Sequence, residues 1–264
     1  MSAEGGSRVD LTTDARVALL DGFALALPSG CPAATADDLP HGVQRLVAYL
    51  SLYRRPARTA IAGELWPEVP EDNAHRSLRS ALWRLQKVAP GLVEVSGGTL
   101  SLARTVRVDV RELTEWAQRM LDPGSDADAS AAPDVGLRGE LLPGWYDDWV
   151  LLERERLRQL RMHALEALAE KLARAGRYGE AVQAAYAAVV AEPLRESAHR
   201  AVVRVHLVEG NLAEAMRAYD AFRAMLAEEL GVAPSQQMDR LICDLPRPRS
   251  GTAERVRSAQ VTAR

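Results

Sequence analysis

The segment from His75 to Lys87 is predicted to form a helix with an apolar face and a basic face on opposite sides. The apolar face must lie against a core, which leaves a cationic surface of the kind that a duplex major groove accepts. A solvated basic face on an ordinary core helix is the alternative. At about 100° per residue, the apolar stripe is Leu78, Ala81, Leu82, Leu85 and Val88, and Asn73, Arg76, Ser80, Trp83 and Lys87 lie opposite, flanked by Arg79 and Arg84.

Two hairpins and two further helices are predicted around this helix. Gly97 and Gly98 lie between alternating apolar residues and supply the positive φ that a tight hairpin turn needs. A second hairpin is predicted about Asp21 and Gly22. The strands of the two hairpins are expected within residues 93–102 and 16–27, and the two helices at about 42–53 and 58–66.

This order of sheet, three helices and hairpin resembles the winged helix-turn-helix domain of response-regulator type over roughly residues 15–110. The resemblance implies that the third helix enters the major groove and that the hairpin, or wing, reaches the adjacent minor groove. Arg54 and Arg55 fall between the first two helices, where they either contact backbone phosphates or are simply solvated. The DNA-binding residues expected from the third helix and the wing are Arg76, Arg79, Ser80, Trp83, Arg84, Lys87, Gly97 and Gly98.

The charge distribution agrees with a nucleic-acid contact in this part of the chain. Residues 45–107 hold ten basic and five acidic residues, whereas the whole chain of 264 residues has a net charge of −3. A local surplus of five positive charges in a mildly acidic protein is expected where one domain touches phosphate and the rest does not.

Residues after Val110 contain an internal repeat of 34 residues. A shift of that length superposes Gly176 on Gly210 and Ala181 on Ala215, and it aligns Tyr178 with Leu212. A 34-residue period is the spacing of tetratricopeptide helix pairs, and the two glycines permit the turn inside each pair. The fold class predicted is therefore mainly α: an N-terminal winged helix-turn-helix with small β hairpins, followed by an all-α tetratricopeptide-like domain.

Several motifs between the wing and the end of the repeats resemble the bacterial transcriptional activator domain. They are Gly-Glu-Leu-Leu-Pro-Gly (139–144), Asp-Trp (148–149), Glu-Arg-Glu-Arg-Leu (153–157) and Glu-Glu-Leu-Gly-Val-Ala-Pro-Ser (228–235). Joined to a winged helix, this domain is similar to the small form of the Streptomyces antibiotic regulatory proteins. The domains expected are a flexible N-terminus (1–14), a DNA-binding domain (15–108), an activator domain (109–245) and a disordered basic tail (246–264).

The resemblance implies a sequence-specific activator that binds promoter repeats in double-stranded DNA as a homodimer and recruits RNA polymerase through the sigma factor. The loop Trp66–Asn73 is the candidate for touching polymerase, through Glu68, Glu71 and Asp72. Helix capping by Asp72 or Asn73 is an equally good structural explanation. A helical-repeat adaptor that does not bind DNA is the alternative function, and it would show acidic or apolar replacements on the basic face.

Catalysis, a metal and a cofactor are not expected. The histidines show no HExxH spacing, and His199 and His206 fall on repeat positions that pack between helices. Trp145, Tyr146 and Trp149 are interpreted as core residues and not as a ligand box. Cys31 and Cys243 are far apart in sequence and indicate a reducing cytoplasm, and no apolar run or leader predicts a membrane span or export.

Overall fold

The computed structural model describes residues 15–27, 39–122, 124 and 139–243. The chain divides into two compact units, Met1–Ala167 and Leu168–Arg264. The predicted flexible N-terminus, the basic tail, Cys31 and most of the segment 122–134 lie outside the described residues. No helix in the described part combines the length and the apolar character that a membrane crossing requires.

The first unit opens with a small sheet whose strands come from both ends of the predicted DNA-binding domain. β1 (Arg16–Ala18) pairs antiparallel with β2 (Ala24–Ala26) and parallel with β5 (Arg107–Val108), in the order β2-β1-β5. The predicted turn is confirmed, since Asp21 and Gly22 both have positive φ, at 63° and 136°.

Three helices follow, close to the predicted bounds: α1 (His41–Leu52), α2 (Arg58–Leu65) and α3 (Glu71–Val88). Val43, Leu46, Val47 and Leu50 form a buried apolar stripe on α1. On α3, Leu78, Ala81 and Leu85 are buried, whereas Leu82 is only partly buried. Val88 was expected on the buried face but is 38% exposed, whereas its neighbours Leu85 and Ala89 are buried.

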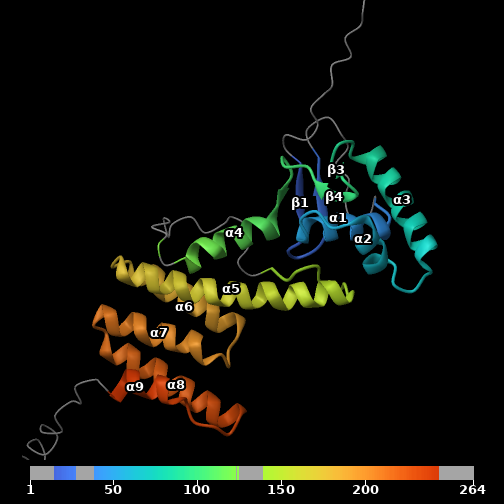
Figure 1. Cartoon of the computed structure of the whole chain (residues 1–264). Coiled ribbons are helices and arrows are strands. Elements are labelled where there is room, and N and C mark those ends of the chain that lie inside the picture. The colour runs from blue at the N-terminus through green and yellow to red at the C-terminus, as the bar shows by residue number, and fades with distance from the viewer. Residues whose placement is uncertain (1–14, 28–38, 123, 125–138, 244–264) are drawn as a thin grey trace, which may run out of the picture. The chain divides into compact units, whose positions relative to one another are not determined.

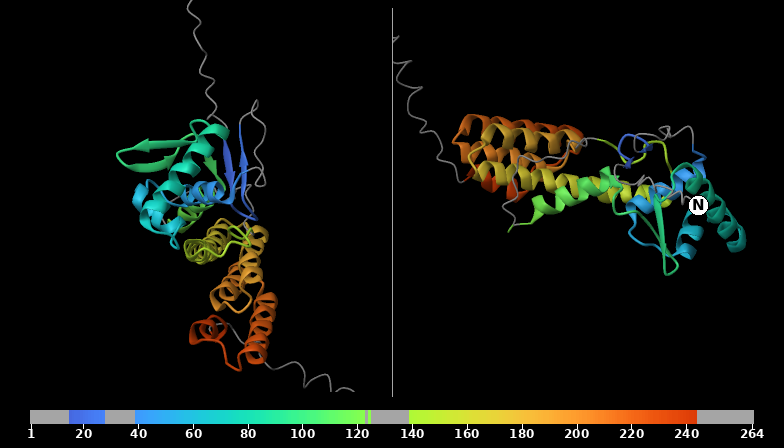
Figure 2. Two further views of the ribbon diagram at one scale, coloured as in Figure 1. Left: turned by 90° about the vertical axis from the view of Figure 1, so that its right-hand side faces the viewer. Right: turned by 90° about the horizontal axis from the view of Figure 1, so that it is seen from above.

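The predicted wing is confirmed as β3 (Val93–Ser96) and β4 (Thr99–Leu102), joined by a two-residue turn at Gly97 and Gly98. Both glycines have positive φ, at 56° and 82°, as the favoured two-residue hairpin turn requires. Leu100 and Leu102 are buried and attach β4 to the core. Figure 2 shows the hairpin extending as an arm past the neighbouring helices.

Helix α4 (Asp109–Leu121) is anchored to the N-terminal sheet through its first residue. The carboxylate of Asp109 is buried and accepts hydrogen bonds from the backbone N–H groups of Leu19, at 2.8 Å, and Leu20, at 2.9 Å. Burial raises the pKa of Asp109, although those backbone donors oppose the rise. On the apolar face of α4, Met120 is buried and Leu121 is exposed.

The core of the first unit extends well beyond residue 108. Leu141, Leu142, Trp149, Val150 and Leu157 belong to the same buried cluster as the residues of the winged helix-turn-helix. A fragment that ended near the predicted domain boundary would therefore lose part of its own core. Trp149 is buried as predicted, but Tyr146 is 80% exposed, which corrects its assignment to the core.

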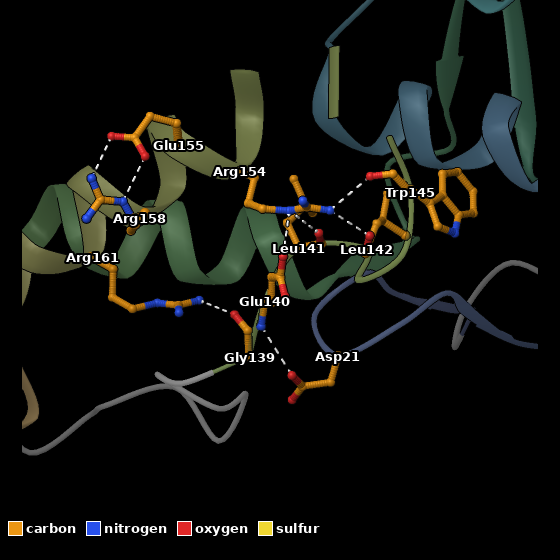
Figure 3. A network of polar contacts seen from close by, with 10 residues as sticks. All are labelled: Asp21, Gly139, Glu140, Leu141, Leu142, Trp145, Arg154, Glu155, Arg158 and Arg161. Carbon is orange, nitrogen blue, oxygen red and sulfur yellow. Dashed lines mark hydrogen bonds and ion pairs between the residues drawn. The ribbon is translucent and has the colours of Figure 1, made fainter. Parts of the chain in front are cut away.

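Two arginines of α5 (Asp148–Arg174) hold the segment that precedes this helix. Arg154 donates to the carbonyl oxygens of Leu141, Leu142 and Trp145 at 2.9–3.1 Å, and Arg161 donates to that of Gly139 at 2.8 Å (Figure 3). On its other side the segment meets the β1–β2 turn. Asp21 N donates to Glu140 O, at 2.8 Å, and Glu140 N donates to the Asp21 carboxylate, at 3.2 Å.

The second unit, which begins in the last turns of α5, contains the repeated helices. These are α6 (Tyr178–Ala191), α7 (Glu196–Glu209), α8 (Leu212–Glu229) and α9 (Gln236–Cys243). Tyr178 and Leu212, which the repeat aligns, each begin a helix, and the preceding Gly176 and Gly210 have φ of 74° and 85°. The repeat prediction is confirmed. Val203, Phe222 and Met238 form the core of its second half.

We predict that Asp109→Ala destabilises the first unit. Two backbone N–H groups, at Leu19 and Leu20, would lose their acceptor, which costs about 1–3 kcal/mol when the groups are buried. Chemical denaturation of the full chain measures the change. Glu115→Ala, an exposed acidic residue on the same helix, is the control and should change stability by less than about 1 kcal/mol. Equal stability of the Asp109→Ala variant and the wild type would show that β1 does not depend on this carboxylate.

Candidate nucleic-acid interface

The six side chains predicted to face DNA from α3 are all exposed. No acidic residue occurs between Asn73 and Val88, so the positive charge on this surface has no counter-charge from its own helix after the first turn. α3 lies along the outer edge of the winged helix-turn-helix (Figure 1). We call this surface the basic face; its members are Arg76, Arg79, Ser80, Trp83, Arg84 and Lys87.

Trp83 and Lys87 act as one group on the basic face. The ammonium of Lys87 lies 3.7 Å from the centroid of the Trp83 ring, within the range of a cation–π contact. The indole is 59% exposed, which is unusual for so large an apolar side chain. The pair therefore presents a flat apolar surface with a fixed positive charge over it.

The arginines of the basic face differ from those of the helical repeats. Among the described residues, Arg79 and Arg84 make no ion pair, and Arg76 makes only a long contact of 3.5 Å with Asn73. Several arginines of the later helices are instead paired with carboxylates three or four residues away, as at Arg174–Glu170, Arg200–Glu196 and Arg217–Glu214. Guanidinium groups without a partner are available to an external anion.

The wing and the connection between α1 and α2 are hydrogen-bonded to each other. The N–H of Arg58 donates to the carbonyl of Gly98, at 3.1 Å, and the N–H of Leu100 donates to that of Pro56, at 3.1 Å. Arg54 and Arg55, just before Pro56, are exposed beside the wing. Arg54 reaches Glu115 of α4, at 3.3 Å, a partner that its sequence neighbours do not reveal.

The acidic residues considered for polymerase contact fall into two places. Glu68 lies in the exposed connection between α2 and α3, whereas Glu71 and Asp72 already belong to the first turn of α3. The predicted capping by Asp72 or Asn73 is wrong, because Pro70 holds the N-cap position and no side chain caps the helix. The negative charges of Glu71 and Asp72 still stabilise the N-terminus of α3, because the helix dipole is positive at that end.

The two candidate histidines of the repeats are packed as expected. His199 and His206 are both buried, and the His199 ring stacks on Phe222 with centroids 4.2 Å apart. Burial lowers the pKa of His199, which favours the neutral ring. Within the described residues, no three His, Cys, Asp or Glu side chains gather in a way that could hold a metal ion.

Comparison with known proteins assigns the family. The family model described as the bacterial transcriptional activator domain matches residues 102–245, more than half of the chain. The chain belongs to this family. The matched region begins at the end of the wing and runs through α4 to α9, so α3 precedes it.

Relatives of this bacterial transcriptional activator domain protein are regulators. The regulatory protein AfsR of Streptomyces coelicolor is 32% identical over 219 residues, and AfsR of Streptomyces griseus is 32% identical over 213 residues. Each alignment covers 75% of this chain, which spans only 21% and 22% of the length of these relatives. The chain is of the Streptomyces antibiotic regulatory protein type.

A solved structure shares the fold. It is Mycobacterium tuberculosis EmbR in complex with a low-affinity phosphopeptide, and it matches with a TM-score of 0.62 at 19% identity. The match covers 94% of this chain and 70% of that chain. The winged helix-turn-helix followed by a helical activator domain is thus an architecture that this bacterial transcriptional activator domain protein shares with EmbR.

We predict that the two fully buried leucines of α3 stabilise the first unit more than the partly buried one. Leu78→Ala and Leu85→Ala each remove a packed side chain and should cost about 2–5 kcal/mol. Leu82→Ala should cost less, because its side chain is only partly buried. Denaturant unfolding of the full chain tests this order. A larger loss for Leu82→Ala would mean that α3 is rotated and that the basic face is wrongly assigned.

Proposed function

We propose that this regulator is a sequence-specific DNA-binding transcriptional activator that acts in the cytoplasm. Residues 15–108 would bind DNA, and residues 109–245 would serve activation and dimer contacts. The observation that supports this most directly is the basic face of α3, where Arg79 and Arg84 are exposed without an ion pair among the described residues. An adaptor that had lost DNA binding would not be expected to keep such a surface.

In this proposal α3 enters the major groove and each exposed group has a role. Arg76, Arg79 and Arg84 pair with guanine edges or phosphates, and Ser80 contacts a base edge. The Trp83 and Lys87 pair offers an apolar surface to a thymine methyl group and a charge to the neighbouring phosphate. Arg54 and Arg55 contact backbone phosphates, and the Gly97–Gly98 turn approaches the minor groove beside the wing.

The partners proposed follow from the family and from the shape of the winged domain. The protein binds promoter repeats as a homodimer and recruits RNA polymerase holoenzyme through its sigma factor. Exposed Glu68, with Glu71 and Asp72 in the next turn, forms an acidic surface at the start of α3. The negative charge of this acidic surface repels DNA phosphates. The acidic surface is therefore available to contact a protein while the basic face of α3 contacts DNA.

We predict that Arg79→Ala and Arg84→Ala weaken DNA binding without unfolding the protein. Loss of an arginine that contacts a base should weaken the free energy of DNA binding by about 1–3 kcal/mol. Loss of a phosphate contact should weaken it less and should lower the slope of log affinity against log salt concentration by about one. The DNA for this test is a genomic fragment that the wild-type protein selects in a genome-wide binding experiment. Fluorescence anisotropy with this fragment measures the affinity and its salt dependence. Arg204→Ala, an exposed arginine of α7, is the matched control. If both α3 variants bind like the wild type, α3 does not read this DNA.

A second prediction separates activation from DNA binding. The triple change Glu68→Ala, Glu71→Ala and Asp72→Ala should reduce transcription several-fold while promoter affinity is kept, because these side chains are assigned to polymerase. Transcription with purified polymerase, at matched promoter occupancy, measures the effect. Glu64→Ala on α2 is the exposed acidic control. Full transcription by the triple variant would remove this surface from the polymerase contact.

A further inference from the structure

An arginine-lined cavity lies in the first unit on elements other than α3. Its volume is about 740 Å³, within the range of small-molecule sites. The walls come from the α1–α2 connection, from β3, β4 and β5, and from α4; neither α2 nor α3 contributes a residue. We call it the arginine cavity. Its arginines are Arg54, Arg55, Arg104, Arg107 and Arg111, and its acidic residues are Glu94, Glu112 and Glu115.

The positive charges of the arginine cavity exceed its negative charges. Arg107 pairs with Glu112, at 2.8 Å, and Arg54 pairs with Glu115, at 3.3 Å. Arg55 and Arg104 are exposed and make no ion pair among the described residues. Five arginines and three glutamates line the cavity, which leaves a surplus of two positive charges there.

The arginine at the helical wall of the cavity is held in place by the protein. Arg111 donates to the backbone carbonyls of Leu50, at 2.6 Å, and Ser51, at 2.8 Å, so its guanidinium is fixed at the end of α1. Burial lowers the pKa of Arg111, and the nearby charge of Arg54 lowers it further. Positive charges therefore lie close enough together to repel each other, which a bound anion would relieve.

The backbone of Arg55, in the α1–α2 connection, also supports a binding role for the cavity. Its φ is 56°, in the left-handed region, where glycine or asparagine is the usual residue. A non-glycine residue in this conformation costs conformational energy. Unusual backbone of this kind is concentrated at ligand sites.

We propose that the arginine cavity binds a small oligophosphate, either free or as the phosphate chain of a nucleotide. Guanidinium groups on separate walls suit an anion that carries several phosphate groups in a row, because each group offers its own oxygens to one fork of donors. The residues that line the cavity include no aromatic side chain, so nothing there stacks on a base. Recognition of the phosphates is thus expected to dominate over recognition of a nucleoside.

Oligophosphate binding at the arginine cavity does not depend on the proposed function. Its expected effect on DNA binding does rest on the proposed function. Arg54 and Arg55 are shared between the arginine cavity and the proposed phosphate contacts of DNA. An oligophosphate in the cavity would engage these two side chains and weaken DNA binding. Direct ligand titration without DNA tests the site alone, so a failure of the site and a failure of the DNA-binding proposal can be distinguished.

The experiment is calorimetric titration of the full chain at physiological salt with sodium tripolyphosphate, ATP, adenosine and citrate. We expect tripolyphosphate and ATP to bind at one site, and adenosine and citrate not to bind. Arg104→Gln with Arg107→Gln should raise the dissociation constant about tenfold or more, since two charged donors are lost. The double change Arg204→Gln with Arg240→Gln, on exposed arginines of the second unit, is the matched control and should have no effect.

Two further variants keep the proposal open to refutation if the first pair disturbs the fold. Glu94→Gln removes an exposed carboxylate from the lining and should tighten tripolyphosphate binding several-fold. Arg79→Gln with Arg84→Gln, on the basic face, should leave tripolyphosphate binding unchanged. The site is refuted if tripolyphosphate gives no heat at millimolar concentration, if citrate binds equally well, or if the basic-face variant loses as much affinity as the cavity variant.

Discussion

The burial of one side of α3 against the core is the constraint on which the rest of the interface depends. Leu78 and Leu85 are fully packed, so the helix cannot rotate without exposing them. That packing alone directs Arg79 and Arg84 outward, and the absence of acidic residues beyond the first turns leaves their charge uncompensated. Charge without a partner is costly inside a protein but useful at a surface that meets phosphate. The basic face is thus a product of core packing as much as of composition.

The core that orients α3 is built from distant parts of the chain. Asp109 connects α4 to β1, and the segment before α5 adds Leu141 and Leu142 to the same cluster. Arg154 holds that segment through its backbone carbonyls and through an ion pair with the Glu140 carboxylate, at 3.0 Å. The region matched by the activator family model consequently begins within the first unit. The winged helix-turn-helix and the start of the activator domain share one hydrophobic core and are therefore expected to unfold together.

The two units differ in how many of their exposed arginines are paired with carboxylates, and their surfaces differ in charge as a result. In the second unit, several arginines pair with a glutamate three or four residues away, as at Arg177–Glu180, Arg200–Glu196 and Arg217–Glu214. In the first unit, the exposed arginines of α3 and of the arginine cavity outnumber nearby carboxylates. A chain with a net charge of −3 can therefore present locally cationic surfaces.

Local patterns in the sequence determined the three helices of the winged domain, both hairpins and the helical repeat. Apolar periodicity, the Gly97–Gly98 turn and the repeated Gly176 and Gly210 act over a few residues, so they can be interpreted without a structure. Tertiary structure alone decided which residues from distant segments meet. It buried Leu141 in the core of the winged domain, exposed Tyr146, paired Arg54 with Glu115 and gathered five arginines into one cavity. Those outcomes depend on packing between elements that lie far apart in the chain, and periodicity carries no information about such contacts.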